Sequence, residues 1–119
     1  GFTSVNDMLI SEDKIIGSYK ISDLTLNGEK INIGQGKYSK EPMLFFEFAN
    51  GFVLSVNDSS YRGNYEKKSD SIFVTLDELY RNIKSLNATI SKNERKLKGL
   101  TDDGQLFEIN IERMKTKNK

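Results

Sequence analysis

The side chains of this chain that could do acid–base chemistry are carboxylates, lysines, tyrosines and hydroxyls, because the sequence has no His and no Cys. A Ser-His-Asp or Cys-His nucleophile and a zinc site with His or thiolate ligands are therefore excluded. Two adjacent carboxylate pairs, Asp77-Glu78 and Asp102-Asp103, are the candidates for an acid–base pair or a calcium site. Neighbouring residues on a strand point to opposite faces, so neither pair converges. Asp102-Asp103-Gly104 also has the composition of a turn.

Three further patterns each have a chemical and a structural explanation. Asn57-Asp58-Ser59 is similar to part of a calcium loop, but it lacks the spaced acidic positions and the closing Glu. Gly34-Gln35-Gly36 could cradle a phosphate, but neither a third Gly nor a helix follows it. A local basic patch is typical of a solvated turn with protective edge-strand charges, and contact with an anionic surface is the alternative. This patch consists of Lys92, Arg95, Lys96 and Lys98. We predict no cofactor and no metal.

The charge balance and the apolar runs limit the partners. Eighteen basic residues against seventeen acidic ones give a net charge of +1, so no general electrostatic attraction to nucleic acid is expected. The longest apolar run, Met43 to Phe46, is the length of a strand and far below the roughly 18 residues of a membrane span. The chain opens Gly1-Phe2, which suggests either a removed leader or a domain excised from a longer chain. We expect a periplasmic or extracellular protein.

Alternation of apolar and polar residues predicts short antiparallel strands joined by tight turns. The clearest pair is Met43 to Ala49 and Phe52 to Val56, around a turn expected at Asn50-Gly51. Further turn signals are Asn27-Gly28 and Asp103-Gly104. Alternating runs cover residues 15–26, 61–65, 72–76, 86–90, 96–100 and 105–114. The stretch Leu76 to Arg81 is ambiguous and is compatible with a short helical turn.

About nine such strands predict an all-β fold, an antiparallel meander that closes into an eight- to nine-stranded barrel. Closure removes the exposed strand edges that would otherwise aggregate. We expect the barrel to be a single domain over residues 14–114. Residues 1–13 are expected to be irregular, with one helical turn capped near residues 11–14, and residues 115–119 to form a frayed basic tail.

Several motifs resemble those of small bacterial lipocalin-like (calycin) barrels. Ile16-Gly17-Ser18-Tyr19-Lys20 is similar to their Gly-x-Trp opening, with Tyr in place of Trp. The sequence Tyr61-Arg62-Gly63-Asn64-Tyr65 and the closing stretch of residues 97–109 also look like parts of that family. The resemblance implies a lipocalin-like barrel with a small apolar ligand in its mouth, no enzymatic activity and, in many members, secretion or lipid anchoring. It also places Tyr19 in the closed end of the barrel, against the last strands.

Two functional hypotheses follow, and an enzyme based only on carboxylates or tyrosines is a third. In the first, the barrel interior holds a small apolar molecule, and a cavity of several hundred Å³ would support it. Its predicted lining is Leu44, Phe46, Phe48, Leu54, Val56 and Tyr65. The alternative is that these side chains only fill the core. In the second, an envelope-associated module contacts a protein or polysaccharide through loops 34–42 and 57–60, with Tyr38 and Tyr61 exposed. The oligomeric state is left open.

Overall fold

Antiparallel strands account for most of residues 15–34, 37–38 and 40–114, the part of the chain that this computed structural model describes. The predicted segment 1–13, its capped turn and the tail 115–119 lie outside these residues. The strands are β1 (Gly17–Leu26), β2 (Glu29–Lys30), β3 (Met43–Glu47), β4 (Gly51–Val56), β5 (Ser59–Lys68), β6 (Ser71–Tyr80), β7 (Ile83–Ile90), β8 (Lys96–Thr101) and β9 (Leu106–Arg113).

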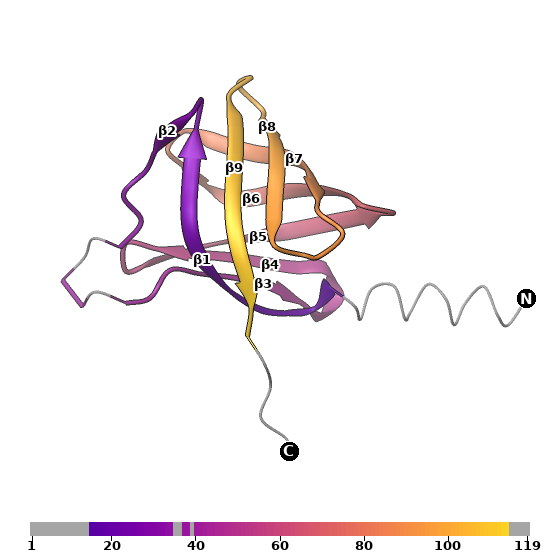
Figure 1. The fold of residues 1–119 in the computed structure, drawn as a ribbon, viewed down its shortest axis with the longest axis horizontal. Coiled ribbons are helices and arrows are strands. Elements are labelled where there is room, and N and C mark those ends of the chain that lie inside the picture. Colours follow the sequence, from indigo (N-terminus) through magenta and orange to yellow (C-terminus); the bar gives the residue numbers. More distant parts are fainter. Residues whose placement is uncertain (1–14, 35–36, 39, 115–119) are drawn as a thin grey trace, which may run out of the picture.

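The strands form a meander that closes on itself (Figure 1). From β3 to β9 each strand pairs with the next one in the chain, and β1 pairs with both β3 and β9. Within the described residues, eight strands thus make a closed antiparallel barrel, and β2 adds a short ninth strand beside the end of β1. The predicted all-β meander and its closure are confirmed.

The turns gather at two ends of the barrel. One end, called the upper end here because β1 points towards it in Figure 1, carries the turns at residues 27–28, 57–58, 81–82 and 102–104. The lower end carries those at 48–50, 69–70 and 91–95. Positive φ at Asn27, Gly28, Asn57 and Asp58 gives the first two upper turns the twist that two-residue hairpins need.

The helical turn considered for Leu76 to Arg81 is wrong. Residues up to Tyr80 belong to β6, and the turn follows at Arg81 and Asn82, both with positive φ. The register between β6 and β7 shifts between Thr75 and Tyr80, as at a β-bulge. Three consecutive exposed residues, at 77–79, interrupt the alternation there. A bulge disrupts the period of two in the same way as a helical turn, which explains the ambiguity of the sequence.

The turn between β3 and β4 lies one residue earlier than Asn50-Gly51. It spans Phe48–Asn50, with positive φ at Ala49 and Asn50, while Gly51 already pairs with Glu47 at the start of β4. A two-residue turn at 50–51 would place Phe46 opposite Ser55. The three-residue turn places Phe46 opposite Phe52 instead, so both apolar sets face inward.

The core consists of the inward side chains of all eight barrel strands, and towards the lower end it is aromatic. Phe46 lies at its centre, with ring centroids 5.8 Å from Tyr19, 5.5 Å from Phe52 and 4.8 Å from Tyr65. Offset and edge-to-face contacts of this kind are favourable beyond the area they bury. The interior towards this end is therefore packed with side chains.

Tyr19 is fully buried and joins the first strand to the last, as the resemblance implied. Its hydroxyl donates to the Ile15 carbonyl oxygen at 2.6 Å and accepts from Arg113 Nη2 of β9 at 2.7 Å. The Arg113 guanidinium also lies 5.2 Å from the centre of the Tyr19 ring. Burial raises the pKa of Tyr19, although the hydrogen bond from Arg113 opposes this shift. The phenol thus remains a neutral donor to Ile15.

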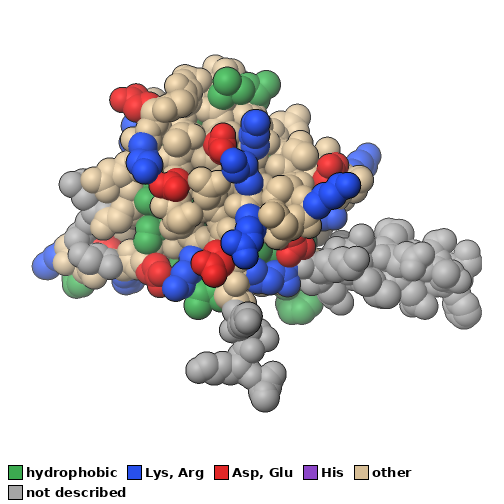
Figure 2. Space-filling model, viewed as in Figure 1, with side chains coloured by type: hydrophobic (Ala, Val, Ile, Leu, Met, Phe, Trp, Pro, Cys, Tyr) green, Lys and Arg blue, Asp and Glu red, His purple; other side chains and the backbone are tan. Residues whose placement is uncertain are grey.

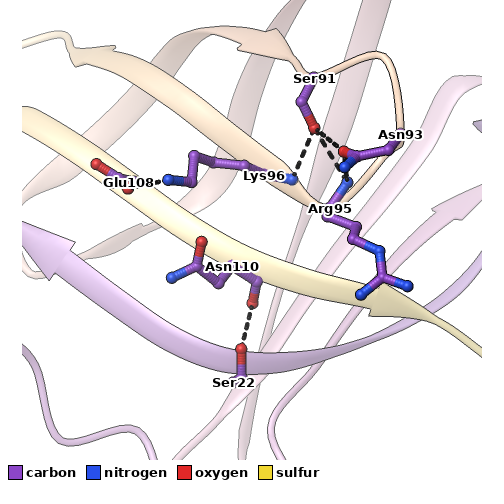
Figure 3. A network of polar contacts seen from close by, with 7 residues as sticks. All are labelled: Ser22, Ser91, Asn93, Arg95, Lys96, Glu108 and Asn110. Carbon is purple, nitrogen blue, oxygen red and sulfur yellow. Dashed lines mark hydrogen bonds and ion pairs between the residues drawn. The ribbon is translucent and has the colours of Figure 1, made fainter.

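The outer wall carries charges of both signs, mixed over the face seen in Figure 2. Figure 3 shows that one cation of the local basic patch, Lys96, is paired with a carboxylate. Lys96 Nζ lies 2.7 Å from Glu108 Oε2, which holds the pKa of Glu108 below its usual value. The Ser91 and Asn93 side chains accept from the main-chain nitrogen of Arg95. The Lys96–Glu108 pair and the hydrogen-bonded turn fit the solvated-turn interpretation at these residues.

Candidate functional site

The structure places the six predicted lining residues in two different environments. Five are buried on the inner face of the barrel: Leu44, Phe46, Leu54, Val56 and Tyr65. Phe48 is 75% exposed, so the expectation that it points inward is wrong. The chain leaves β3 at Glu47 and turns at Phe48, before the next inward position is reached.

The apolar space inside the barrel is small. An apolar void of about 20 Å³ lies among side chains that include Leu26, Phe52, Leu54, Leu76, Tyr80 and Phe107. That is room for about one water molecule, against the roughly 300–1,000 Å³ of a typical ligand pocket. Of the predicted lining residues, only Leu54 borders it. The side chains named from the sequence mostly fill the core, which was the alternative to a binding cavity.

A larger concavity lies at the upper end, between the β1–β2, β6–β7 and β8–β9 turns. This upper hollow has a volume of about 440 Å³. Its lining consists of Leu26, Asn27, Glu29, Ile31, Arg81, Asn82 and Gln105. Leu26 borders both the upper hollow and the void, so the two are adjacent. A concavity of similar volume on the outer wall, around Phe73 and Leu100, shares no lining residue with the void.

Asn27 fixes one side of the upper hollow. Its main-chain nitrogen donates to the Leu106 carbonyl oxygen at 2.7 Å, and its side-chain Oδ1 accepts from the Leu106 nitrogen at 2.9 Å. Its Nδ2 lies 3.5 Å from Gln105 Oε1. These contacts hold the β1–β2 turn against β9, so this side of the hollow is formed before any ligand arrives.

The segment after β2 completes the wall. The main-chain nitrogen of Ile31 donates to the Leu24 carbonyl oxygen at 2.9 Å. The main-chain nitrogen of Asn57 donates to the Ile33 carbonyl oxygen at 3.0 Å. The segment thus connects β1 to the β4–β5 turn, with Ile33 buried and Ile31 partly buried against the core. The sequence did not lead us to predict a ligand contact in the segment after β2. The feature that could have indicated this part of the wall is the apolar pair Ile31 and Ile33, which follows Asn27-Gly28.

Tyr80, at the end of β6, lines the void and is only 6% exposed. Its ring packs edge-on against Tyr61 with centroids 4.9 Å apart. Tyr61 is therefore half-buried against the core rather than exposed on a loop, contrary to the expectation from the sequence. Burial raises the pKa of Tyr80. Among the described residues, its hydroxyl has no hydrogen-bond partner.

The two loops predicted for macromolecular contacts lie together. The Asp58 carboxylate accepts from the main-chain nitrogens of Tyr38 at 2.6 Å and Lys40 at 2.8 Å. Asp58 thereby holds Tyr38 and Lys40 against the β4–β5 turn, which gives this residue of the Asn57-Asp58-Ser59 pattern a structural role. Tyr38 is 69% exposed on this loop. Residues 35, 36 and 39 lie outside the described part.

The paired carboxylates of the β8–β9 turn have separate partners. Asp102 Oδ1 accepts from the main-chain nitrogens of Lys84 at 2.8 Å and Ser85 at 3.2 Å. Asp103 accepts from the Thr101 hydroxyl and from Gln105 Nε2. Both carboxylates therefore stabilise the turn and its contact with β7, as the turn interpretation expects.

This arrangement predicts a dependence of stability on pH. The hydrogen bonds from Lys84 and Ser85 hold the pKa of Asp102 below its ordinary value of 3.8. Because the folded pKa is lowered, the stabilisation by Asp102 is fully present above that ordinary value, and it is lost as the pH falls through the folded pKa. We expect Asp102→Asn to flatten the acid limb of the stability curve, measured by urea unfolding from pH 2 to 6. Equal acid limbs in both proteins would contradict this role.

The sequence matches no protein-family model and no curated protein. Among the described residues, no group of three or more acidic side chains is placed to hold a metal ion. No described helix has the length and hydrophobicity needed to cross a bilayer. The geometry of the upper end is thus the main basis for assigning a function.

Proposed function

We propose that this chain is a non-enzymatic, lipocalin-like binding barrel that holds a small molecule with an apolar body in the upper hollow. The observation that carries the proposal is the position of the hollow, which opens at one end of a closed barrel and borders the apolar void through Leu26. Its volume of about 440 Å³ lies within the range of small-molecule pockets. The packed interior acts as a rigid scaffold for the turns that surround the upper hollow.

The side chains of the upper hollow suit a molecule that has both an apolar and a polar part. Leu26 and Ile31 offer apolar surface, and the other lining residues offer hydrogen-bond donors and acceptors: Asn27, Glu29, Arg81, Asn82 and Gln105. Polar groups beside an apolar patch fix the orientation of a ligand, while the apolar surface that the ligand buries adds to its affinity. Arg81 and Asn82 belong to a tight turn, and hydrogen bonds to Leu106 fix Asn27 at the side of the hollow. Few side chains and turns therefore have to become ordered when a ligand binds.

The resemblance to lipocalin-like barrels supports the same assignment. The Gly17-Ser18-Tyr19 opening lies on β1 where it meets β9, and Tyr19 closes the lower end together with Arg113. A barrel closed at one end by packed aromatic side chains leaves the other end for a ligand. The upper hollow lies at that other end.

The test is the fluorescence of N-phenyl-1-naphthylamine, a neutral apolar dye. We expect wild-type protein to enhance its emission, and Ile31→Arg to weaken binding by about tenfold or more, because a charge would have to be covered by the dye. Ile31 is only partly buried, so this variant is expected to fold. The matched control is Phe48→Arg, which makes the same kind of change at an exposed site of the lower end and should bind the dye as wild type does. No enhancement, or equal binding by folded Ile31→Arg, would refute the proposal.

A second candidate function is contact with a protein or polysaccharide through the loop of residues 34–42. The observation in its favour is Tyr38, an exposed ring whose main-chain nitrogen Asp58 holds in place. Exposed aromatic rings on pre-ordered loops are suitable for stacking on a partner. If the dye test fails, this candidate is the better account of the chain.

A further inference from the structure

The buried hydroxyl of Tyr80 is a polar group without an assigned role. The side chain is more than nine-tenths buried, and no described residue accepts or donates a hydrogen bond at its hydroxyl. Buried hydroxyls in folded proteins are nearly always paired, because an unpaired one has lost its hydrogen bonds to water without replacement. An exception beside the void that adjoins the hollow calls for a partner that the described residues do not supply.

The position of Tyr80 connects it with the upper hollow. Tyr80 borders the void, and the next residue, Arg81, borders the hollow. Leu26 borders both spaces, so the two meet at this residue. Contact between a molecule in the hollow and Tyr80 therefore requires the Leu26 side chain to change rotamer.

A water molecule is a poor partner for this hydroxyl. The void of about 20 Å³ is large enough for one water, but its other walls are leucine, isoleucine and phenylalanine side chains. A buried water is retained where it finds two to four polar partners, and here Tyr80 offers at most one. An oxygen that belongs to a larger apolar molecule does not have this difficulty, because the apolar part of that molecule contacts the apolar walls.

We propose that the Tyr80 hydroxyl donates a hydrogen bond to a neutral acceptor oxygen, such as that of a ketone, ester or ether, on the molecule bound in the upper hollow. This inference rests on the proposed function and specifies its ligand class. A phenol of ordinary pKa, about 10, is already protonated and a donor at neutral pH, and burial raises the pKa of Tyr80 further. A carboxylate is disfavoured as the partner, because apolar surroundings penalise a charge far more than a neutral carbonyl group.

The test compares acetophenone with ethylbenzene, two molecules of similar shape of which only the first has an acceptor oxygen. Each is used to displace N-phenyl-1-naphthylamine from wild type, from Tyr80→Phe and from the control Tyr61→Phe. We expect Tyr80→Phe to weaken the binding of acetophenone about fivefold, the effect of one hydrogen bond. The affinity for ethylbenzene should not change. Tyr61→Phe removes a hydroxyl from the ring that contacts Tyr80, and it should change neither the affinity for acetophenone nor that for ethylbenzene.

Thermal unfolding gives a second, ligand-free measurement. Tyr80→Phe removes a buried hydroxyl that has no partner in the protein, so the variant should unfold at a higher temperature than wild type. A lower unfolding temperature would show that the hydroxyl has a partner in the chain and would overturn the inference. Equal weakening of both ligands, or of neither, by Tyr80→Phe would overturn it too and leave the proposed function standing. If neither the two ligands nor the dye bind to wild type, the proposed function and the role of Tyr80 are both refuted.

Discussion

Tyr19→Ala is expected to lower the free energy of unfolding by about 3–5 kcal/mol, the usual range when a large buried aromatic side chain is truncated. Tyr19 is fully buried, and its ring packs edge-on against Phe46. Its hydroxyl links Ile15 to Arg113 and so connects the start of β1 with the end of β9. The truncation would leave a cavity and unpair the Ile15 carbonyl. Urea unfolding followed by circular dichroism measures the change.

Tyr19→Phe separates the ring from the hydroxyl. This variant keeps the aromatic packing and loses both hydrogen bonds, so we expect a decrease of about 1–2 kcal/mol. A loss below about 1 kcal/mol for Tyr19→Ala would be incompatible with the burial described for this residue. It would also remove the structural support for the resemblance to lipocalin-like barrels at the first strand.

Gly63→Ala is expected to destabilise the protein by about 3 kcal/mol or more, at the upper end of the range for overpacked sites. Gly63 lies on the inner face of β5 between Phe52 and Leu76. A Cβ placed on it would lie 2.0 Å from the Thr75 carbonyl oxygen and 2.8 Å from the Leu76 Cα. Both atoms are main-chain atoms of β6, so relief requires the two strands to separate.

Gly34→Ala is the matched control for this substitution. Nothing lies within 4 Å of a Cβ at Gly34. The free energy of unfolding of the Gly34→Ala variant should therefore stay within about 0.5 kcal/mol of the wild-type value. Urea unfolding of the two variants side by side gives the comparison. A Gly63→Ala protein as stable as Gly34→Ala would mean that β5 and β6 do not approach as closely as described.

The fold could be predicted from the sequence because its signals are local. Alternation along each strand identified the inward set, and turn residues such as Asn27-Gly28 marked where strands end. The error at Asn50-Gly51 shows the limit of that reasoning. A preferred turn dipeptide competed with the requirement that Phe46 and Phe52 share a face, and the packing of the two strands decided the register.

The candidate site could be predicted only in part. Inward alternation identified Leu44, Phe46 and Tyr65 correctly as buried, but alternation does not distinguish a core from a cavity wall. That difference depends on side chains from strands distant in the sequence. The upper hollow joins turns near residues 27, 81 and 105, whose proximity follows from closure of the whole barrel. The unpaired hydroxyl of Tyr80 likewise appears only when all of its neighbours are in place.

The most direct test of the proposed binding site is a map of amide chemical shifts. ¹⁵N-labelled protein is titrated with N-phenyl-1-naphthylamine, and the shifted amides are assigned to the barrel. We expect the largest shifts at the residues that line the upper hollow, near 26–31, 81–82 and 105, with the turns at 48–50 and 69–70 unchanged. Shifts centred on the lower turns, or no shifts at saturating dye, would contradict a ligand site at the upper end of the barrel.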